Sequence, residues 1–228
     1  AQKYLDTFIQ ERSANYMKHI SKPELSRKSC SRLSPYLAYG NLSMREVYQA
    51  AISGKWHKRN IQFFIARLHW HCHFIQKFES ECSIETTNLN AAFNHIRTEW
   101  NQTYFDAWVQ GKTGYPMVDA CMRCLHQTGY INFRMRAMLI SFLTHNLWLD
   151  WKQGAHHLAR LFLDYEPGIH YPQVQMQAGC MGVNIIRTYN PVKQSQDHDP
   201  EGTFIKQWIP ELRNVPAPLV HQPWLMTE

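Results

Sequence analysis

The sequence predicts an all-α protein whose single domain spans residues 1–228. Apolar residues recur with helical periodicity through most of the chain, whereas alternating patterns are scarce and only residues 182–189 could form a short extended segment. Hydrophobic residues make up 44% of the chain and charged residues 18%, which is the balance of a packed domain. A chain of 228 residues is also long enough to bury a substantial core.

The first two predicted helices lie in the N-terminal third of the chain. Ser34 followed by Pro35 has the pattern of an N-cap and a first-turn proline, and it predicts a helix that runs through Tyr39 and ends at Gly40. Residues 61–78 are also helical in pattern.

Two further helices are expected in the middle of the chain. One lies between Pro116 and Gly129, which are typical residues of a helix start and stop. Its apolar stripe consists of Val118, Cys121, Met122 and Leu125. The other is predicted over residues 132–150, with one face made of Met135, Met138, Leu139, Phe142 and Asn146. Residues 165–190 contain many Gly and Pro residues and are expected to form an ordered loop with short helical pieces.

Composition restricts the class of protein. The net charge of +6 fits a polyanionic partner, although many basic enzymes never bind nucleic acid. Aromatic residues at 13%, with eight Trp, fit a buried flat ligand or stacking on bases, and also an aromatic core. The six cysteines have no regular spacing, which indicates a reducing compartment. Polar residues interrupt the most apolar stretch, 137–149, so we expect no membrane partner and a cytoplasmic location, with the nucleoid as its site in a bacterium.

The segment Ser31-Arg32-Leu33-Ser34 precedes a predicted helix start. Hydroxyl groups and free N–H groups at such a position can bind phosphate, because the helix dipole and the unpaired donors point the same way. The alternative is an ordinary N-cap, which four residues alone favour.

Arg134 and Arg136 are followed by Asp164 and Glu166. A buried arginine must be paired and hydrogen-bonded, so such residues often surround a polar ligand. A surface helix with solvated charges accounts for the same residues equally well. Downstream, the cationic residues Arg187, Lys193 and Lys206 could contact phosphates, or could belong to a charged loop beside a packed Phe204/Trp208 helix.

Two motifs suggest metal binding but are better explained without it. His69 and His73 share a helix face at i and i+4, yet no third ligand has a suitable spacing. Cys121 and Cys124 form a CxxC motif in mid-helix, where core packing is the better explanation. We therefore expect no metal.

Four segments taken together resemble the C-terminal half of the photolyase and cryptochrome family. They occur in the family's order and cover nearly the whole chain, whereas the family's N-terminal α/β antenna domain has no counterpart in this sequence. The resemblance implies the all-α, helical FAD-binding domain of photolyase/cryptochrome type. The segments are Ser31–Ser43, Gly111–Arg123, Thr128–Arg136 and Asn190–Leu212.

The resemblance implies FAD as the cofactor and assigns residues to its site. The diphosphate is expected to be held by Cys30, Ser31, Leu33 and Ser34, with Arg32 in support and Tyr16 as a looser candidate. Beside the isoalloxazine it implies an ion pair between Arg136 and Asp164, with Glu166 near the polar edge. Phe64 and Tyr130 are expected to form the cavity wall, and Phe133 takes a cofactor-site position where cyclobutane photolyases have an asparagine. His170 is expected near the flavin N5, where a protonatable imidazole could tune the redox state.

The resemblance also implies damaged DNA as the partner. Trp70 aligns with a tryptophan that stacks on a flipped pyrimidine dimer, which is the least costly to extrude from single-stranded or damaged DNA. The residues expected to contact DNA are Trp70, Arg134, Met176, Arg187 and Lys193.

The sequence departs from the family pattern at several functional positions. Arg67, expected at the cofactor and lesion, replaces the glutamate of cyclobutane dimer repair, and Asn132 and Arg136 replace the histidine pair of (6-4) enzymes. Trp151 and Trp100 match the middle and outer tryptophans of the photoreduction relay. Val174 replaces the inner one, so electrons need another route, through Trp148 or a tyrosine such as Tyr165.

Three functions are compatible with these features. The leading interpretation is a light-dependent flavoenzyme that repairs UV lesions in DNA, best on accessible or single-stranded sites. The second is a cryptochrome-type blue-light photoreceptor with the same flavin and no repair activity. The third is a flavin-binding protein that works only with a separate antenna-domain protein.

Overall fold

The computed structural model of the protein describes residues 1–54, 58–182 and 186–226, and this part of the chain is helical without any strand. The all-α prediction is confirmed. None of the helices in the described segments combines the length and the apolar character that a bilayer crossing requires.

The α-helices of the described residues are α1 (Gln2–Gln10), α2 (Tyr16–His19), α3 (Pro23–Ser29), α4 (Ser34–Ala38), α5 (Met44–Ser53), α6 (Lys58–Ser80), α7 (Gln102–Gln110), α8 (Pro116–Thr128), α9 (Phe133–Ser141), α10 (Trp151–Leu161), α11 (Pro167–Ala178), α12 (Pro191–His198), α13 (Thr203–Trp208) and α14 (Ala217–Val220). Short 3-10 turns connect them at η1 (Arg12–Asn15), η2 (Cys82–Glu85), η3 (Ala91–Phe93), η5 (Pro210–Leu212) and η6 (Pro223–Leu225), and η4 (Phe142–Asn146) is a π-helical turn.

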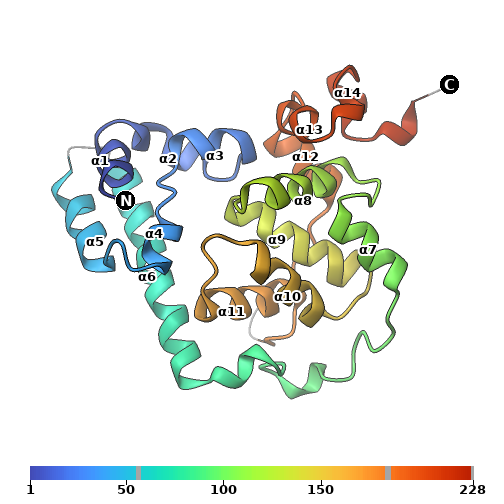
Figure 1. Cartoon of the computed structure of the whole chain (residues 1–228), viewed down its shortest axis with the longest axis horizontal. Coiled ribbons are helices and arrows are strands. Elements are labelled where there is room, and N and C mark those ends of the chain that lie inside the picture. The colour runs from blue at the N-terminus through green and yellow to red at the C-terminus, as the bar shows by residue number, and fades with distance from the viewer. Residues whose placement is uncertain (55–57, 183–185, 227–228) are drawn as a thin grey trace.

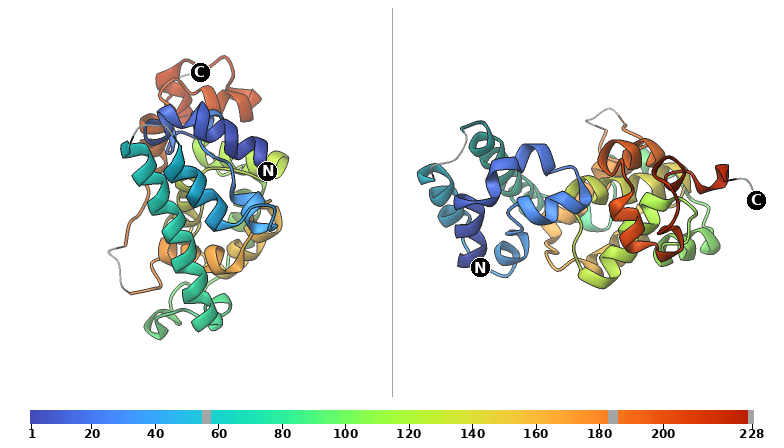
Figure 2. Two further views of the ribbon diagram at one scale, coloured as in Figure 1. Left: turned by 90° about the vertical axis from the view of Figure 1, so that its left-hand side faces the viewer. Right: turned by 90° about the horizontal axis from the view of Figure 1, so that it is seen from above.

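The helices form two groups, each with its own apolar cluster (Figures 1 and 2). Helices α1–α5 pack with the first half of α6 around residues such as Phe8, Val47 and Phe64, and the helices from α7 onward surround a larger core. The long helix α6 joins the groups: Phe64 and Leu68 belong to the smaller cluster, and Phe78 packs against the larger one. Burial of apolar surface therefore positions the two groups on either side of α6.

Helix α11 packs closely against α6 at Gly168. A Cβ at residue 168 would lie only 3.1 Å from the Cα of Ile75 and 3.3 Å from the Cβ of Phe78. Glycine therefore allows the two backbones to approach, and this contact sets the distance between α6 and the helix that follows Asp164.

The prediction of a loop over residues 165–190 is wrong for its first half, because residues 167–178 form α11. Pro167 lies in the first turn, where a missing N–H has no intrahelical partner to lose. Pro172 lies inside the helix and removes one hydrogen bond, but packing against α6 and α9 stabilises the helix. Gly179 ends it with a φ of 74°. In the segment 182–189, predicted to be extended, residues 183–185 lie outside the described part of the chain.

The other predicted helices differ from the structure mainly at their ends. Helix α8 begins at Pro116 and ends before Gly129, as predicted, and α6 extends beyond residues 61–78 at both ends. The helix predicted over 132–150 is shorter: α9 ends at Ser141, η4 follows, and Trp148 takes a left-handed φ of 58°. On its predicted face Asn146 is exposed, whereas the other four residues are buried.

Helix α4 is displaced by one residue from its prediction. Leu33 is the N-cap, Ser34 is already helical, and the helix ends at Ala38 rather than Tyr39. Pro35 fits the first turn of the helix whether Ser34 or Leu33 is the N-cap. The sequence pattern therefore did not distinguish the two helix starts.

The Gly168→Ala variant tests the contact between α6 and α11. Alanine favours helix formation by roughly 1 kcal/mol over glycine, yet its methyl group would push α11 away from Ile75, so we expect a net loss of about 1–3 kcal/mol in the free energy of unfolding. Urea denaturation measures this loss. The exposed α10 substitution Gln153→Ala is the control and should change stability by less than about 0.5 kcal/mol. A Gly168→Ala variant as stable as the parent would refute the close contact.

Candidate functional site

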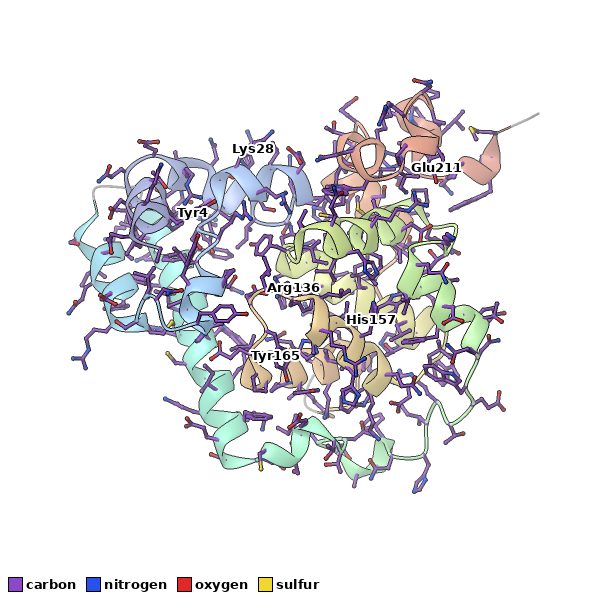
Figure 3. All side chains as sticks on the ribbon, in the orientation of Figure 1. Tyr4, Lys28, Arg136, His157, Tyr165 and Glu211 are labelled. Atoms are coloured by element: carbon purple, nitrogen blue, oxygen red, sulfur yellow. The ribbon has the colours of Figure 1, made fainter. Side chains whose placement is uncertain are left out.

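A pocket with about 530 Å³ of empty space, part of it open to solvent, lies beside α9, α10 and α11. Its wall combines apolar side chains with a few polar groups. The apolar lining includes Phe133, Ile140, Leu158, Phe162, Ile169 and Val174, and the polar lining is Arg136, Asp164, Tyr165, Glu166, His170, Gln173 and Gln177. Figure 3 shows Arg136 and Tyr165 on the side of the larger helix group that faces the N-terminal helices.

The central polar feature is an ion pair between Arg136 of α9 and Asp164. The Arg136 Nη2 lies 2.9 Å from Asp164 Oδ2, and its Nε donates to the Ile131 carbonyl at 2.9 Å. Burial raises the pKa of the Asp164 carboxyl, but the charge of Arg136 and the polar contact with Ser34 outweigh this effect and lower it overall. Asp164 is therefore ionised although its side chain is only 3% exposed. The Ser34 contact also links the N-terminal loop to the pocket.

Three arginines surround the buried phenol ring of Tyr130. The guanidinium carbons of Arg32, Arg136 and Arg27 lie 5.1, 5.5 and 6.0 Å from the ring centroid. Arg27 also donates to the Tyr130 carbonyl at 3.1 Å. Positive charge is thus concentrated beside the pocket, and only Arg136 among the three has a carboxylate partner in the described residues. Such a region favours an anionic ligand.

The segment of residues 30–34 lies next to these arginines. Arg12 donates to the carbonyls of Cys30 and Ser31 and so fixes the course of the segment. Arg32 adopts a left-handed φ of 53°, a conformation that is costly for a residue with a side chain and that clusters at binding sites. Its buried Nε has no hydrogen-bond partner among the described residues. Residues 31, 32 and 34 are half-buried.

The other expected cofactor residues of this region pack into the smaller apolar cluster. Tyr16 and Phe64 contact each other edge-to-face at 5.6 Å, and Leu33 belongs to the same cluster. Burial raises the pKa of the Tyr16 phenol, and it raises that of the Cys30 thiol to about 12. These buried side chains can support residues 30–34 from the side of the smaller apolar cluster. Leu33 can contribute only its backbone to a ligand.

His170 lines the pocket as a neutral imidazole. Burial lowers its pKa to about 4, and its Nε2 donates to the Ala155 carbonyl at 2.9 Å. The Nε2 therefore carries the hydrogen, and Nδ1 is left as an acceptor. The surrounding protein therefore favours the uncharged imidazole at neutral pH, and the tuning of the flavin by His170 stays a prediction.

Glu166 pairs with a residue that the sequence analysis missed. Its Oε2 lies 3.0 Å from His71 Nε2 on α6, so the pair connects the start of α11 to α6 at the edge of the pocket. Nothing in the local pattern distinguished His71 from the neighbouring histidines. His69 instead stacks on Tyr48, and His73 contacts the edge of Trp70. The described residues contain no group of three metal-ligating side chains.

The residues expected to meet a lesion lie on α6, outside the pocket lining. Trp70 is 48% exposed, with its ring 5.4 Å from that of Phe74. Arg67 places its guanidinium 4.8 Å from the ring of Phe63. The structure therefore does not bring Trp70 or Arg67 into the pocket lining with Arg136 and Asp164, although α6, which carries both, packs against α11.

The remaining expected residues are dispersed. Trp151 is buried and donates its indole N–H to Asn88 at 2.7 Å, whereas Trp100 is at the surface with its ring 4.9 Å from that of Phe105. The residues assigned to DNA differ in exposure, with Arg134 and Met176 half-buried and Arg187 and Lys193 exposed. Other polar residues that the sequence analysis missed are Arg12, Arg27 and Gln173, which only the folded chain brings to the site.

The neutral His170 predicts a pH dependence of stability. Because its folded pKa of about 4 lies below the unfolded value of 6.5, the unfolded chain binds the proton more readily. Stability should therefore fall as pH decreases from 6.5 toward 4, by up to about 3 kcal/mol from this residue. Urea denaturation of the parent and of His170→Asn across this range measures the contribution. Identical slopes in the two proteins would show that His170 is not held neutral.

Comparison with known proteins agrees with this geometry. The family model described as the FAD binding domain of DNA photolyase matches residues 64–228. The deoxyribodipyrimidine photo-lyase of Vibrio cholerae is 36% identical over 96% of this chain and 48% of its own length. The cryptochrome DASH of Synechocystis is 35% identical over 86% of this chain and 41% of its own length. The chain thus spans about half the length of the curated relatives it matches.

Solved structures show the same relation. A bacterial class III photolyase from Agrobacterium tumefaciens superposes with a TM-score of 0.93 at 28% identity, over 100% of this chain and 48% of its own. A Synechocystis cryptochrome gives a TM-score of 0.92 at 30% identity, over 99% of this chain and 48% of its own. The chain therefore belongs to the DNA photolyase and cryptochrome family and carries that family's FAD-binding domain.

Proposed function

We propose that this protein is a light-driven photolyase-like enzyme that repairs UV-induced pyrimidine lesions in DNA with electrons from reduced FAD. The observation that carries the proposal is the Arg136–Asp164 ion pair in the pocket wall, in which the carboxylate is buried and the guanidinium is 23% exposed. A buried ion pair seldom stabilises a fold more than apolar side chains do, so its presence in a pocket wall supports a binding role.

The residues present fit FAD. Three buried polar atoms have no hydrogen-bond partner among the described residues and lie where a polar ligand can satisfy them: Arg32 Nε, Asp164 Oδ1 and Gln173 Oε1. Arg32 and Ser34 would hold the negatively charged diphosphate. Asp164 would accept a hydrogen bond from the isoalloxazine, Arg136 would balance charge beside it, and His170 would offer its unprotonated Nδ1.

The bound flavin, once reduced, supplies the chemistry: it absorbs blue light and donates an electron that splits the lesion and then returns. The chain's own residues would bind and orient the substrate. The exposed indole of Trp70 offers a stacking surface for an extruded base, worth ~1–3 kcal/mol. Arg187 and Lys193 are exposed and would contact phosphates, in keeping with the net charge of +6.

A cryptochrome-type photoreceptor without repair activity is the second candidate. The specific observation that favours it is Arg67, which replaces the glutamate expected in cyclobutane dimer repair and lies against Phe63.

Illumination of the reduced protein with an oligonucleotide that contains a thymine dimer distinguishes the two functions. We expect thymines to be restored under blue light, faster on single-stranded than on double-stranded DNA. The control is the same mixture in the dark. A flavin-loaded protein that restores no thymine would support the photoreceptor role instead.

Substitution of Asp164 should weaken FAD binding. The Asp164→Ala variant leaves the Arg136 guanidinium unpaired at the pocket, and loss of a charged hydrogen bond typically costs about 1.5–3 kcal/mol, or roughly 10- to 150-fold in affinity. Titration of the apoprotein with FAD, followed by flavin fluorescence, measures the effect. The matched control is Asp6→Ala, which removes an exposed carboxylate of α1 and should leave FAD affinity unchanged. Unchanged affinity in Asp164→Ala would remove the ion pair from the site.

Substitution of Trp70 should affect damaged DNA selectively. We expect Trp70→Ala to weaken binding of a dimer-containing strand by about 5- to 150-fold, because the stacking surface is lost. Binding of undamaged DNA should change much less, since it depends on phosphate contacts. Trp224→Ala, another exposed indole, serves as the control in the same gel-shift assay. An equal loss with both DNAs would argue against a lesion-binding role.

A further inference from the structure

A series of aromatic rings leads from the pocket into the protein along the start of α11. Tyr165 lines the pocket, and its ring centroid lies 5.5 Å from that of His170 and 6.4 Å from that of Tyr171. His170 and Tyr171 are in turn 5.2 Å apart. Rings at such separations allow rapid electron exchange between neighbours. Neutral His170 is hard to oxidise, so the two tyrosines are the redox-active members.

Tyr171 has a proton acceptor beside it. The ring is buried, and η2, which carries Glu85, packs against α11. Burial raises the pKa of the Tyr171 phenol, and the nearby Tyr165 hydroxyl and Glu85 carboxylate raise it further. A phenol that keeps its proton in the ground state can lose an electron easily only if the proton leaves as well. Glu85 is half-buried on η2, which packs against α11.

Trp148 and Trp151 do not line the pocket, and each has a cation over its ring. The Arg97 guanidinium lies 5.0 Å from the ring of Trp148, and the Lys152 ammonium 5.9 Å from that of Trp151. A cation over an aromatic face stabilises the neutral ring relative to an oxidised, positively charged one. At the position of the missing inner tryptophan, Val174 contributes only an aliphatic side chain to the pocket wall.

We propose that Tyr165 and Tyr171 form the route by which electrons reach the oxidised flavin, with Glu85 as the acceptor of the Tyr171 proton. This inference rests on the proposed function, since only a light-driven flavoprotein needs such a supply.

Each cycle of electron transfer moves one electron to the flavin and one proton from Tyr171 to Glu85. Under illumination Tyr165 gives one electron to the flavin, and Tyr171 replaces it while its hydroxyl proton moves to the Glu85 carboxylate. Tyr171 is left as a neutral radical and Glu85 as the neutral acid. Because Tyr171 is buried, an external thiol then supplies one electron to it through the intervening protein, Glu85 returns the proton, and the thiol proton is released. Two such cycles deliver two electrons to the flavin and oxidise two thiols to a disulfide.

Photoreduction kinetics test the proposal. The FAD-loaded protein is illuminated anaerobically with dithiothreitol, and bleaching of the oxidised flavin band is followed. We expect Tyr171→Phe and Glu85→Gln each to slow bleaching by at least about tenfold, which corresponds to about 1.4 kcal/mol on the barrier. Trp148→Phe should bleach at the rate of the parent. Parental rates in both Tyr171→Phe and Glu85→Gln, or a tenfold loss in Trp148→Phe alone, would overturn the proposal.

A spectroscopic signature separates a redox role from a structural one. Samples frozen under illumination should show the electron paramagnetic resonance signal of a neutral tyrosyl radical, which narrows when the protein contains ring-deuterated tyrosine and disappears in Tyr171→Phe. A tryptophan radical in the parent would contradict the route. The melting temperature and FAD affinity of each variant show whether slower bleaching is caused by misfolding. If Tyr171→Phe misfolds, the bleaching rate of Glu85→Gln decides the outcome.

The test is independent of the repair assay. If Tyr171→Phe is first reduced chemically with dithionite, it should repair a thymine dimer at the rate of the parent, because the route is needed only to reduce the flavin. If the chemically reduced parent repairs nothing, the repair function fails while the photoreduction result still decides the route.

Discussion

The structure of the site depends on one ion pair whose carboxylate is buried. Arg136 comes from α9 and Asp164 from the connection between α10 and α11, so their contact fixes how these elements meet. Neither charge is stable in the interior without the other, because removal of one partner leaves an unpaired ion. The ring of Phe162, 4.1 Å from the guanidinium, covers the pair on one side. The pocket wall, its charge and its unsatisfied oxygen all follow from this contact.

The ion pair acts together with a rigid scaffold. Helix α6 belongs to both apolar clusters, and the close approach at Gly168 holds α11 against it. The His71–Glu166 contact adds a polar connection between the same two helices. The residues that face a ligand are therefore carried by packed helices rather than by loops, which gives a binding site precision.

Helices whose ends carry local sequence signals could be predicted from the sequence, whereas helices that depend on tertiary contacts could not. Helix α8 could be bounded because Pro116 and Gly129 act on the backbone directly. Helix α11 could not, because Pro172 and Gly168 disfavour a helix locally and only packing on α6 stabilises it. In the site, the residues alone left the pairing of Arg136 with Asp164 undecided, and only the family resemblance predicted it. His71 and Arg27 were missed, because no local pattern marks residues that meet across the fold.

Asp164 Oδ1 has no hydrogen-bond partner among the described residues, and this affects the stability of the protein in a cell. A ligand that binds only the folded chain stabilises it by mass action, by about 2.7 kcal/mol at a hundred times its dissociation constant. Before that ligand arrives, newly made chains keep a buried polar atom unsatisfied and open more often, which exposes them to proteases. Cellular flavin supply would then govern not only how many copies are active but how many survive.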